Sequence, residues 1–161
     1  YKKASTIYSH LSVLAISDTR KLCYAPNNCV RKYTMTFREM LKIMTPFRLA
    51  FGKANLAGLQ RILTEDFVWH LQTGYGPEDA PTGRVVQGAQ GMVDELMWRR
   101  ANWKNVKYTR LVESPAGDRI LQQFRCSGVN EYGNAFHVDA VDVYSIVDGK
   151  ISKKDTYWKY F

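Results

Sequence analysis

Long apolar runs are missing from this sequence. Its 161 residues are 45% hydrophobic, but the apolar residues occur a few at a time, far short of the ~20 that a membrane-spanning helix needs. A transmembrane protein is therefore excluded. The ordinary apolar fraction likewise excludes a wholly disordered chain and a collagen-like fibre. The length fits one domain of about 100–150 residues.

Cysteine is also scarce, with Cys23, Cys29 and Cys126 as the whole complement. Their number is odd, and no Cys-x-x-Cys pair or histidine completes a set of metal ligands. We interpret the three as free thiols in a reducing cytoplasm. The apolar stretch Leu11–Ile16 is too short for a secretory signal, and no small-residue cleavage site follows it. We expect a cytoplasmic protein with no metal and no cofactor.

The net charge of +8 is unevenly spread. Residues 1–34 carry six basic groups and one acidic group, whereas residues 35–161 carry 17 basic and 14 acidic groups with both signs interspersed. A nucleic-acid-binding domain usually gathers its positive charge on one face. Because no such gathering is visible, neither nucleic acid nor membrane is expected as a partner. We expect residues 1–34 to be a poorly ordered basic leader and residues 35–161 to form the functional domain.

Helix signals begin just after Met35. Thr36-Phe-Arg-Glu39 is a capping box, in which a hydroxyl and a carboxylate satisfy free amides of the first turn. Pro46 would break a continuing helix but fits the first position of a new one capped by Thr45. Asn55 can cap a further short helix, and a longer helix is predicted from Ala89 to about Asn102. The predicted apolar stripe of this last helix consists of Met92, Val93, Leu96 and Met97.

Strand signals follow the first helices and fill the end of the chain. The run Phe67–Leu71 is β-branched and aromatic, which is typical of a short strand. Asp148-Gly149 between two alternating runs is a strong hairpin signal. Helices followed by a long antiparallel meander predict an α+β fold, with the helices packed on one face of a curved sheet. The further strands are predicted at Val106–Glu113, Arg119–Val129, Phe136–Val147 and Lys150–Tyr160.

Four stretches in this order resemble the nuclear transport factor 2-like superfamily, and within it the SnoaL-like and ketosteroid isomerase-like domains. They are Phe47–Leu63, Thr64-Glu-Asp-Phe-Val-Trp-His70, Thr82–Gly88 and Ala140–Ile151. The resemblance covers about residues 37–161. It implies a cone-shaped α+β fold whose curved sheet encloses an apolar pocket for a small hydrophobic molecule. It also implies a homodimer and, as in several members of this superfamily, which includes polyketide cyclases, chemistry without a cofactor.

Asp142 is the first candidate for chemistry. It lies between Val141 and Val143 on a predicted strand, and a carboxyl group that faces an apolar cavity has its pKa raised. Such a group can act as a proton donor near neutral pH or as a base. By resemblance it occupies the position of the hydrogen-bonding acid of the isomerases. The alternative is a solvent-facing aspartate, or one paired with a nearby lysine or arginine.

The resemblance is incomplete at the other catalytic positions. The base of the isomerases would fall at Leu71 and their oxyanion tyrosine at Phe47, neither of which has the required group. The arginine and the second carboxylate of the related epoxide hydrolases would fall at Ala140 and Thr156. Neither catalytic set is complete, so neither of these two mechanisms is expected.

His70 is the second candidate for chemistry. It follows Trp69 at the end of a predicted strand, a pair frequent in SnoaL-like sequences, and histidine titrates near neutral pH. His137 has the strand parity opposite to that of Asp142 and should not share its pocket. The alternative for His70 is a histidine at the mouth of the cone, or one bonded to backbone.

The remaining candidates would form the wall of the pocket. Aromatic and apolar side chains at strand or helix spacing are more often core than ligand platform, so each also has a structural interpretation. Tyr75 opens a glycine-rich loop, Gly74–Gly83, that could form a mobile rim. The predicted substrate-binding residues are Trp69, Leu71, Phe47, Met97, Tyr144, Thr156, Trp158 and Tyr75.

Two functions agree with these features. The first is a cofactor-free enzyme that transfers protons on a small hydrophobic substrate, as an isomerase, cyclase, dehydratase or hydrolase, with Asp142 as acid or base and His70 as its partner. The second is a non-catalytic ligand-binding or dimerisation module, since a fold alone does not determine function.

Overall fold

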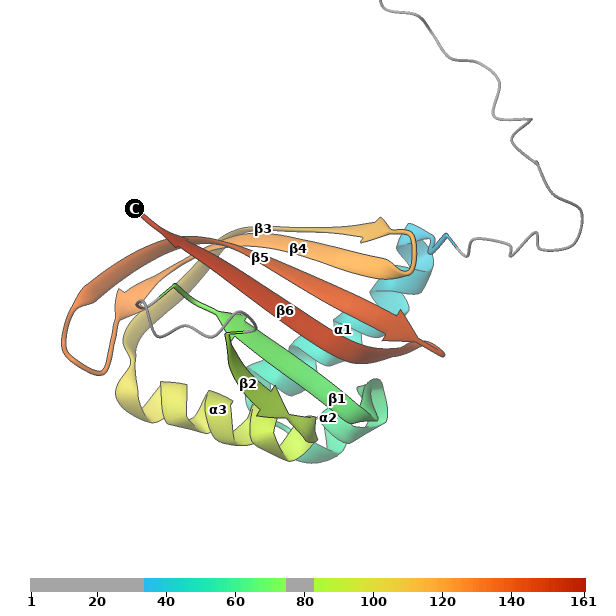
Figure 1. Ribbon diagram of the computed structural model, residues 1–161, viewed down its shortest axis with the longest axis horizontal. Coiled ribbons are helices and arrows are strands. Elements are labelled where there is room, and N and C mark those ends of the chain that lie inside the picture. Colours follow the sequence, from blue (N-terminus) through green and yellow to red (C-terminus); the bar gives the residue numbers. More distant parts are fainter. Residues whose placement is uncertain (1–33, 75–82) are drawn as a thin grey trace, which may run out of the picture. The chain divides into compact units, whose positions relative to one another are not determined.

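Three helices and six strands follow one another in residues 34–74 and 83–161, which are the residues described by the computed structural model (Figure 1). The predicted leader lies outside this description apart from Thr34, as does Tyr75. The helices are α1 (Phe37–Lys53), α2 (Leu56–Ile62) and α3 (Gly88–Asn102). The strands are β1 (Leu63–Gln72), β2 (Arg84–Gln87), β3 (Lys104–Ala116), β4 (Arg119–Val129), β5 (Ala135–Val147) and β6 (Lys150–Tyr160).

The strands form one curved sheet in the order β2-β1-β6-β5-β4-β3. Strands β3 to β6 are a continuous antiparallel meander, whereas β1 pairs with β6 in parallel. The long strands arch over the helices, which lie together on one face (Figure 1). The predicted α+β class and its curved sheet are therefore confirmed. Strand β2 was not predicted; it is a four-residue edge strand that pairs with β1. Among the described residues no helix is both long and apolar enough to cross a membrane.

Helix α1 begins at the predicted capping box but does not stop at Pro46. Thr36 Oγ1 accepts a hydrogen bond from the Glu39 amide, and the Glu39 carboxylate accepts one from the Thr36 amide. The predicted new helix at Pro46 is wrong, because one helix runs through it. Pro46 is exposed, and the buried face of α1 continues from Met44 to Phe47 across it. Packing of that face outweighs the cost of about 3 kcal/mol of an interior proline.

The face of helix α3 that packs against the sheet carries both apolar and charged side chains. Its buried residues are Met92, Glu95, Leu96 and Arg99, which recur at the i, i+3, i+4 and i+7 spacing of one helix face. Met97 is 53% exposed. The predicted place of Met97 in the apolar stripe is therefore wrong, because one residue beyond Leu96 the helix has already turned toward solvent. Two charged side chains, Glu95 and Arg99, are buried in its stead.

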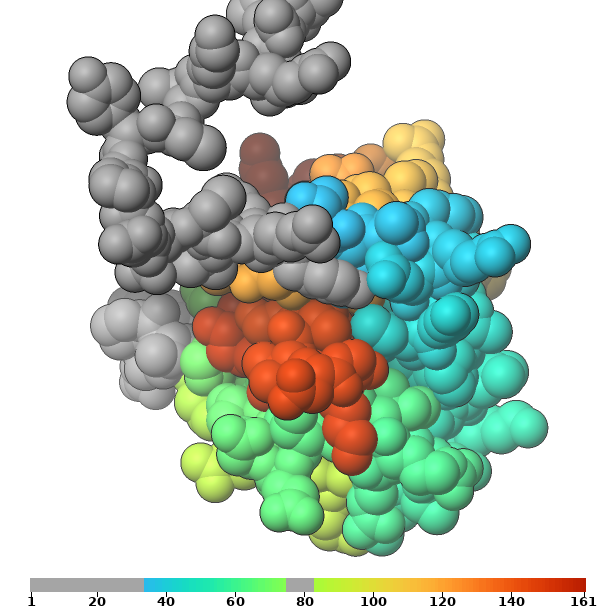
Figure 2. All heavy atoms as spheres, turned by 90° about the vertical axis from the view of Figure 1, so that its right-hand side faces the viewer, coloured from blue at the N-terminus to red at the C-terminus, as the bar shows by residue number. Residues whose placement is uncertain are grey.

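The apolar interior has two parts. One cluster joins the three helices to the inner face of the sheet and includes Phe47, Trp69 and Tyr144. The other lies under β4 and β5 and includes Phe124 and the free thiol of Cys126. Burial raises the pKa of the Cys126 thiol to about 11. Figure 2 shows one end of the domain, where α1 (cyan) lies beside the hairpin of β5 and β6 (orange-red).

Candidate functional site

A cavity of about 550 Å³ lies between the two clusters, under the curved sheet. Its walls include Phe47 of the first cluster and Phe124 of the second. The exposed residues of its lining come from α1, α3 and β3, so the cavity opens between these three elements. These exposed residues are Gly52, Arg100, Tyr108 and Leu111. The volume suits a small organic molecule, since ligand pockets typically measure roughly 300–1,000 Å³.

Two rows of side chains across the sheet form the floor. Asp142 on β5 is in register with Gln122 on β4 and with Thr156 on β6. Two residues further along β5, Tyr144 is in register with Lys154 on β6, and Lys154 with Trp69 on β1. Because strand residues two apart share a face, both rows point inward. The predicted parity of Asp142 and Tyr144 is confirmed by their burial.

Asp142 is 2% exposed and accepts hydrogen bonds at both carboxylate oxygens. Its Oδ1 atom accepts from Thr156 Oγ1 at 2.6 Å. Its Oδ2 atom lies 3.2 Å from the Tyr144 hydroxyl and forms an ion pair with Lys154 Nζ. The sequence analysis left open that Asp142 pairs with a lysine or arginine, and it does pair with Lys154. This ion pair lies inside the cavity rather than at the surface.

The Thr156 hydroxyl joins the two rows. It donates to Asp142, accepts from Trp69 Nε1 at 2.8 Å and accepts from Lys154 Nζ at 2.9 Å. A hydroxyl has one proton to donate and two lone pairs that accept, so all three are used here. Thr156 therefore holds the carboxylate and the ammonium group in one fixed arrangement.

Lys154 is the buried cation of this floor, with its side chain 3% exposed. Burial lowers the pKa of its ammonium group to about 8, although the charge of Asp142 opposes this shift. Its Nζ atom lies 4.7 Å from the centre of the Trp69 ring and 5.2 Å from that of Tyr144. A lysine with a pKa of about 8 can both give and take a proton close to neutral pH.

A chain of polar contacts runs from the floor toward the rim. The Tyr144 hydroxyl lies 3.0 Å from Gln122 Oε1, and Gln122 Nε2 donates to Glu113 Oε1 at 2.6 Å. Glu113 in turn forms an ion pair with Arg48 on α1. Burial, and then the charge of Asp142, raises the pKa of Tyr144 well above its ordinary value. Tyr144 therefore stays protonated and acts as a donor.

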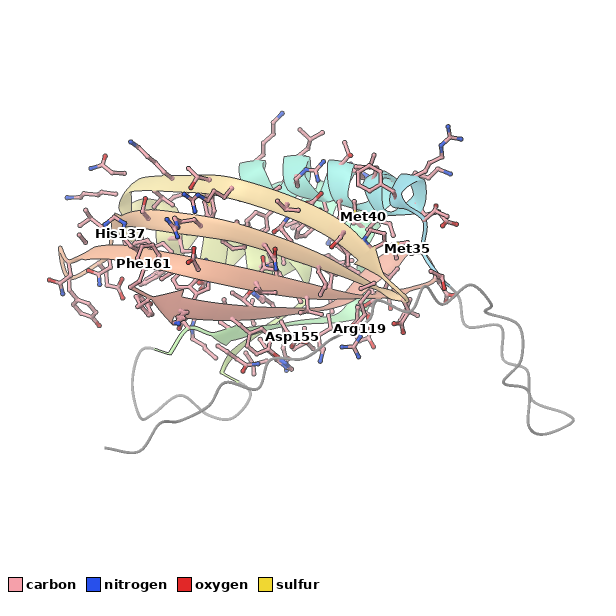
Figure 3. All side chains as sticks on the ribbon, turned by 90° about the horizontal axis from the view of Figure 1, so that it is seen from above. Met35, Met40, Arg119, His137, Asp155 and Phe161 are labelled. Carbon is pink, nitrogen blue, oxygen red and sulfur yellow. The ribbon has the colours of Figure 1, made fainter. Side chains whose placement is uncertain are left out.

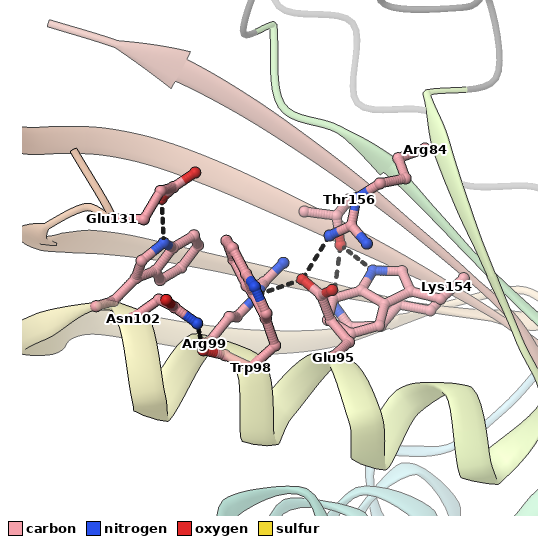
Figure 4. A network of polar contacts seen from close by, with 10 residues as sticks. Arg84, Glu95, Trp98, Arg99, Asn102, Glu131, Lys154 and Thr156 are labelled. Carbon is pink, nitrogen blue, oxygen red and sulfur yellow. Dashed lines mark hydrogen bonds and ion pairs between the residues drawn. The ribbon is translucent and has the colours of Figure 1, made fainter.

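Helix α3 supplies a second polar group on the other side of the cavity (Figure 4). Glu95 Oε1 accepts from Arg99 Nε at 2.7 Å and from Arg84 at 2.6 Å. Burial alone would raise the pKa of Glu95, but the two arginines outweigh it and lower the pKa. The Arg99 guanidinium lies 4.7 Å from the ring centre of Trp103 and 5.0 Å from that of Trp69.

The structure brings most of the predicted wall residues to this cavity, but not all. Leu71 is buried in the first cluster and does not line the cavity, and Met97 lies on the exposed side of α3. Tyr75 is outside the described residues. Predicted residues that do line the cavity are Asp142, Phe47, Trp69, Tyr144, Thr156 and Trp158.

The structure does not bring His70 to Asp142. Because Trp69 and Leu71 point inward, His70 between them points to the outer face of the sheet. There its Nδ1 atom lies 2.9 Å from Asp155 Oδ1. Figure 3 looks onto this outer face and labels Asp155. The hypothesis of a His70–Asp142 pair has no geometric support, and the strand alternation is the physical reason.

Lys154, Arg99 and Gln122 were missed in the sequence. Two of them had a signal: Lys154 is two residues before Thr156 on the same strand face, and Arg99 is three residues after Leu96 on the same helix face. Gln122 had none, because the facing side of its strand depends on the register with β5.

The fold and site define a domain in which helices and a curved sheet enclose a small-molecule-sized cavity. The family model for the SnoaL-like domain matches residues 46–154. The chain therefore belongs to the SnoaL-like domain family, as the resemblance predicted. A search of curated protein sequences finds no significant match.

Solved structures agree on the fold. A nuclear transport factor 2-like protein from Burkholderia xenovorans superposes with a TM-score of 0.63 at 19% identity, over 78% of this chain and 92% of that chain. A candidate polyketide cyclase from Xanthomonas campestris gives 0.58 at 14% identity, over 76% and 91%. A candidate isomerase from Bacillus subtilis gives 0.56 at 19% identity, over 78% and 90%. At these identities the likeness establishes the nuclear transport factor 2-like fold alone.

Proposed function

We propose that the protein binds a small, largely apolar carbonyl compound in the cavity and transfers a proton on it. Lys154 exchanges the proton with the substrate, and Asp142 acts as its positioning residue. The observation that carries this proposal is the buried ion pair of Lys154 and Asp142 on the floor of a cavity whose lining is rich in aromatic side chains. Catalytic groups with shifted pKa values in a cleft are typical of sites for acid–base chemistry.

Lys154 suits proton exchange better than Asp142 does. The carboxylate oxygens of Asp142 already face Thr156, Tyr144 and Lys154, so they have little room to approach a substrate carbon. Lys154 lines the cavity, and its lowered pKa of about 8 makes the free amine accessible near neutral pH. Asp142 and Thr156 hold that amine in place.

The proposed step is proton abstraction from a carbon next to a carbonyl group. The free amine of Lys154 takes the proton, and the electron pair of the C–H bond moves to form an enolate whose charge lies on the carbonyl oxygen. The ammonium group then returns the proton to the same carbon or, in a conjugated substrate, to a different one. The positive side chains around the cavity would stabilise the enolate, because charge interactions are strong away from water.

The test is deuterium exchange into a model ketone. Wild-type protein in D₂O should accelerate exchange at the carbons flanking the carbonyl of 2-tetralone, measured by NMR, and Lys154→Met should reduce the rate at least ~100-fold. His70→Gln, a change on the outer face, is the matched control and should retain the rate. An exchange rate in Lys154→Met equal to that of wild type would contradict the role of Lys154.

The alternative function is a binding module without chemistry. It is favoured by the fact that the floor side chains Asp142, Thr156 and Lys154 already satisfy one another, as in a purely structural network. A thermal shift with 2-tetralone but no exchange in wild type would support this alternative. Assembly as a homodimer and a cytoplasmic location stay predictions, and sedimentation equilibrium would measure the first.

A further inference from the structure

Arg99 has the most unused hydrogen-bonding capacity among the cations that line the cavity. Arg48 pairs with Glu113, Lys154 pairs with Asp142, and Arg100 donates to the Gly52 carbonyl at 2.8 Å. Arg99 donates to Glu95 through Nε alone. Within residues 34–74 and 83–161 no acceptor meets its two Nη atoms, although the side chain is only 10% exposed.

Three tryptophans hold the Arg99 guanidinium in place. Its Cζ atom lies 4.7 Å from the ring centre of Trp103, 5.0 Å from that of Trp69 and 5.7 Å from that of Trp158. Figure 4 shows the side chain reaching from α3 toward the sheet. Aromatic faces attract a guanidinium but accept no strong hydrogen bond from it. The aromatic rings therefore hold the cation in place, while no acceptor in the described part of the chain takes its Nη hydrogens.

The charges around the cavity do not cancel. The five cations Arg48, Arg84, Arg99, Arg100 and Lys154 line the cavity or pair with its polar groups, and they face three carboxylates, those of Asp142, Glu95 and Glu113. Arg48, Arg84 and Arg100 are partly or largely exposed, so water screens this excess of positive charge, which favours the approach of an anion to the opening of the cavity. Among anions, a carboxylate matches the planar fork of an arginine.

We propose that the ligand carries a carboxylate that binds the Nη atoms of Arg99, and a flat apolar body that packs against the tryptophans. This inference rests on the proposed function, since it names the substrate class of the same cavity. Arg99 and Lys154 both lie over the Trp69 ring, so they are within about 10 Å of each other. One small molecule can thus reach Arg99 with its carboxylate and Lys154 with its carbonyl.

The test compares two probes of nearly the same size and shape, the anion 2-naphthoate and the neutral 2-naphthamide. Calorimetric titration of wild-type protein should give an affinity for the naphthoate at least ~10-fold higher. The double variant Glu95→Gln with Arg99→Met removes one charge of each sign, so it keeps the net charge and leaves no buried carboxylate partly paired. It should bind the two probes equally, with its affinity for the naphthamide within about threefold of wild type.

Each other outcome has a defined meaning. Equal affinities in wild type would overturn the carboxylate inference while leaving the cavity as a small-molecule site. If the double variant still prefers naphthoate, the anion binds elsewhere and the carboxylate inference is overturned. The same holds if the preference is lost in Arg100→Met and not in the double variant. If neither probe binds wild type, the inference fails, whereas deuterium exchange into 2-tetralone still decides the proposed function separately. Circular dichroism checks that the double variant folds.

Discussion

Asp142 and Lys154 form an ion pair on neighbouring strands in which each side chain is 3% exposed. Lys154 is not the register partner of Asp142; that position belongs to Thr156, and Lys154 reaches the carboxylate diagonally. A buried pair of this kind contributes little net stability, because each ion has lost its hydration, but removal of one partner leaves an uncompensated charge. Its position on the floor of the cavity, rather than any gain in stability, is the observation on which the proposed function rests.

The first prediction concerns the coupling of this pair. Asp142→Asn and Lys154→Met should each lower the free energy of unfolding by about 3–5 kcal/mol, because each leaves the other charged group buried without its partner. The variant with both changes should be destabilised by clearly less than the sum of the two. Urea unfolding of the four proteins measures the cycle. Additive losses would show that the two groups do not interact.

The second prediction concerns the pH dependence of stability. Burial lowers the pKa of Lys154 from 10.5 to about 8, so between these values the unfolded chain binds more protons than the folded one. Stability of wild type relative to Lys154→Met should therefore rise with pH across this window, by a total of about 3 kcal/mol. Below pH 8 the difference between the two should stay constant. Urea unfolding at several pH values measures it, and a constant difference up to pH 10.5 would contradict the lowered pKa.

The third prediction concerns the Thr156 hydroxyl. Thr156→Val keeps the shape but leaves the buried Trp69 Nε1 without its acceptor and Asp142 Oδ1 without its donor. The free energy of unfolding should fall by about 2–4 kcal/mol. Thr156→Ser, which keeps the hydroxyl, is the control and should cost no more than about 1 kcal/mol. Equal losses in the two variants would mean that packing, not hydrogen bonding, is the role of Thr156.

The fourth prediction concerns His70 on the outer face. His70→Gln should leave the affinity for cavity ligands unchanged within about twofold. It should lower the free energy of unfolding by only about 1 kcal/mol, since the contact with Asp155 is partly exposed. Calorimetric titration and urea unfolding measure the two effects. A large loss of ligand affinity would restore His70 as a cavity residue.

Local sequence signals predicted a helix or strand well where a short-range interaction determines where that element begins. The Thr36–Glu39 capping box starts α1 because both of its hydrogen bonds lie within four residues. Strand alternation predicted that Asp142 points to the inner face of the sheet. The same alternation turns His70 to the outer face, because its neighbour Trp69 points inward. Pro46 was misjudged because the burial that carries α1 past it comes from tertiary packing.

The sequence by itself determined the α+β class and the placement of one acidic side chain on the inner face of the sheet, because these depend on periodicity and turns. Its resemblance to SnoaL-like domains predicted the family. Only the tertiary structure decided what that side chain meets. The parallel pairing of β1 with β6 sets Trp69 beside Lys154 and Leu71 beside Thr156, and the packing of α3 turns Arg99 inward. Such contacts join residues far apart in the chain, so their geometry depends on register and helix rotation, which no local pattern records.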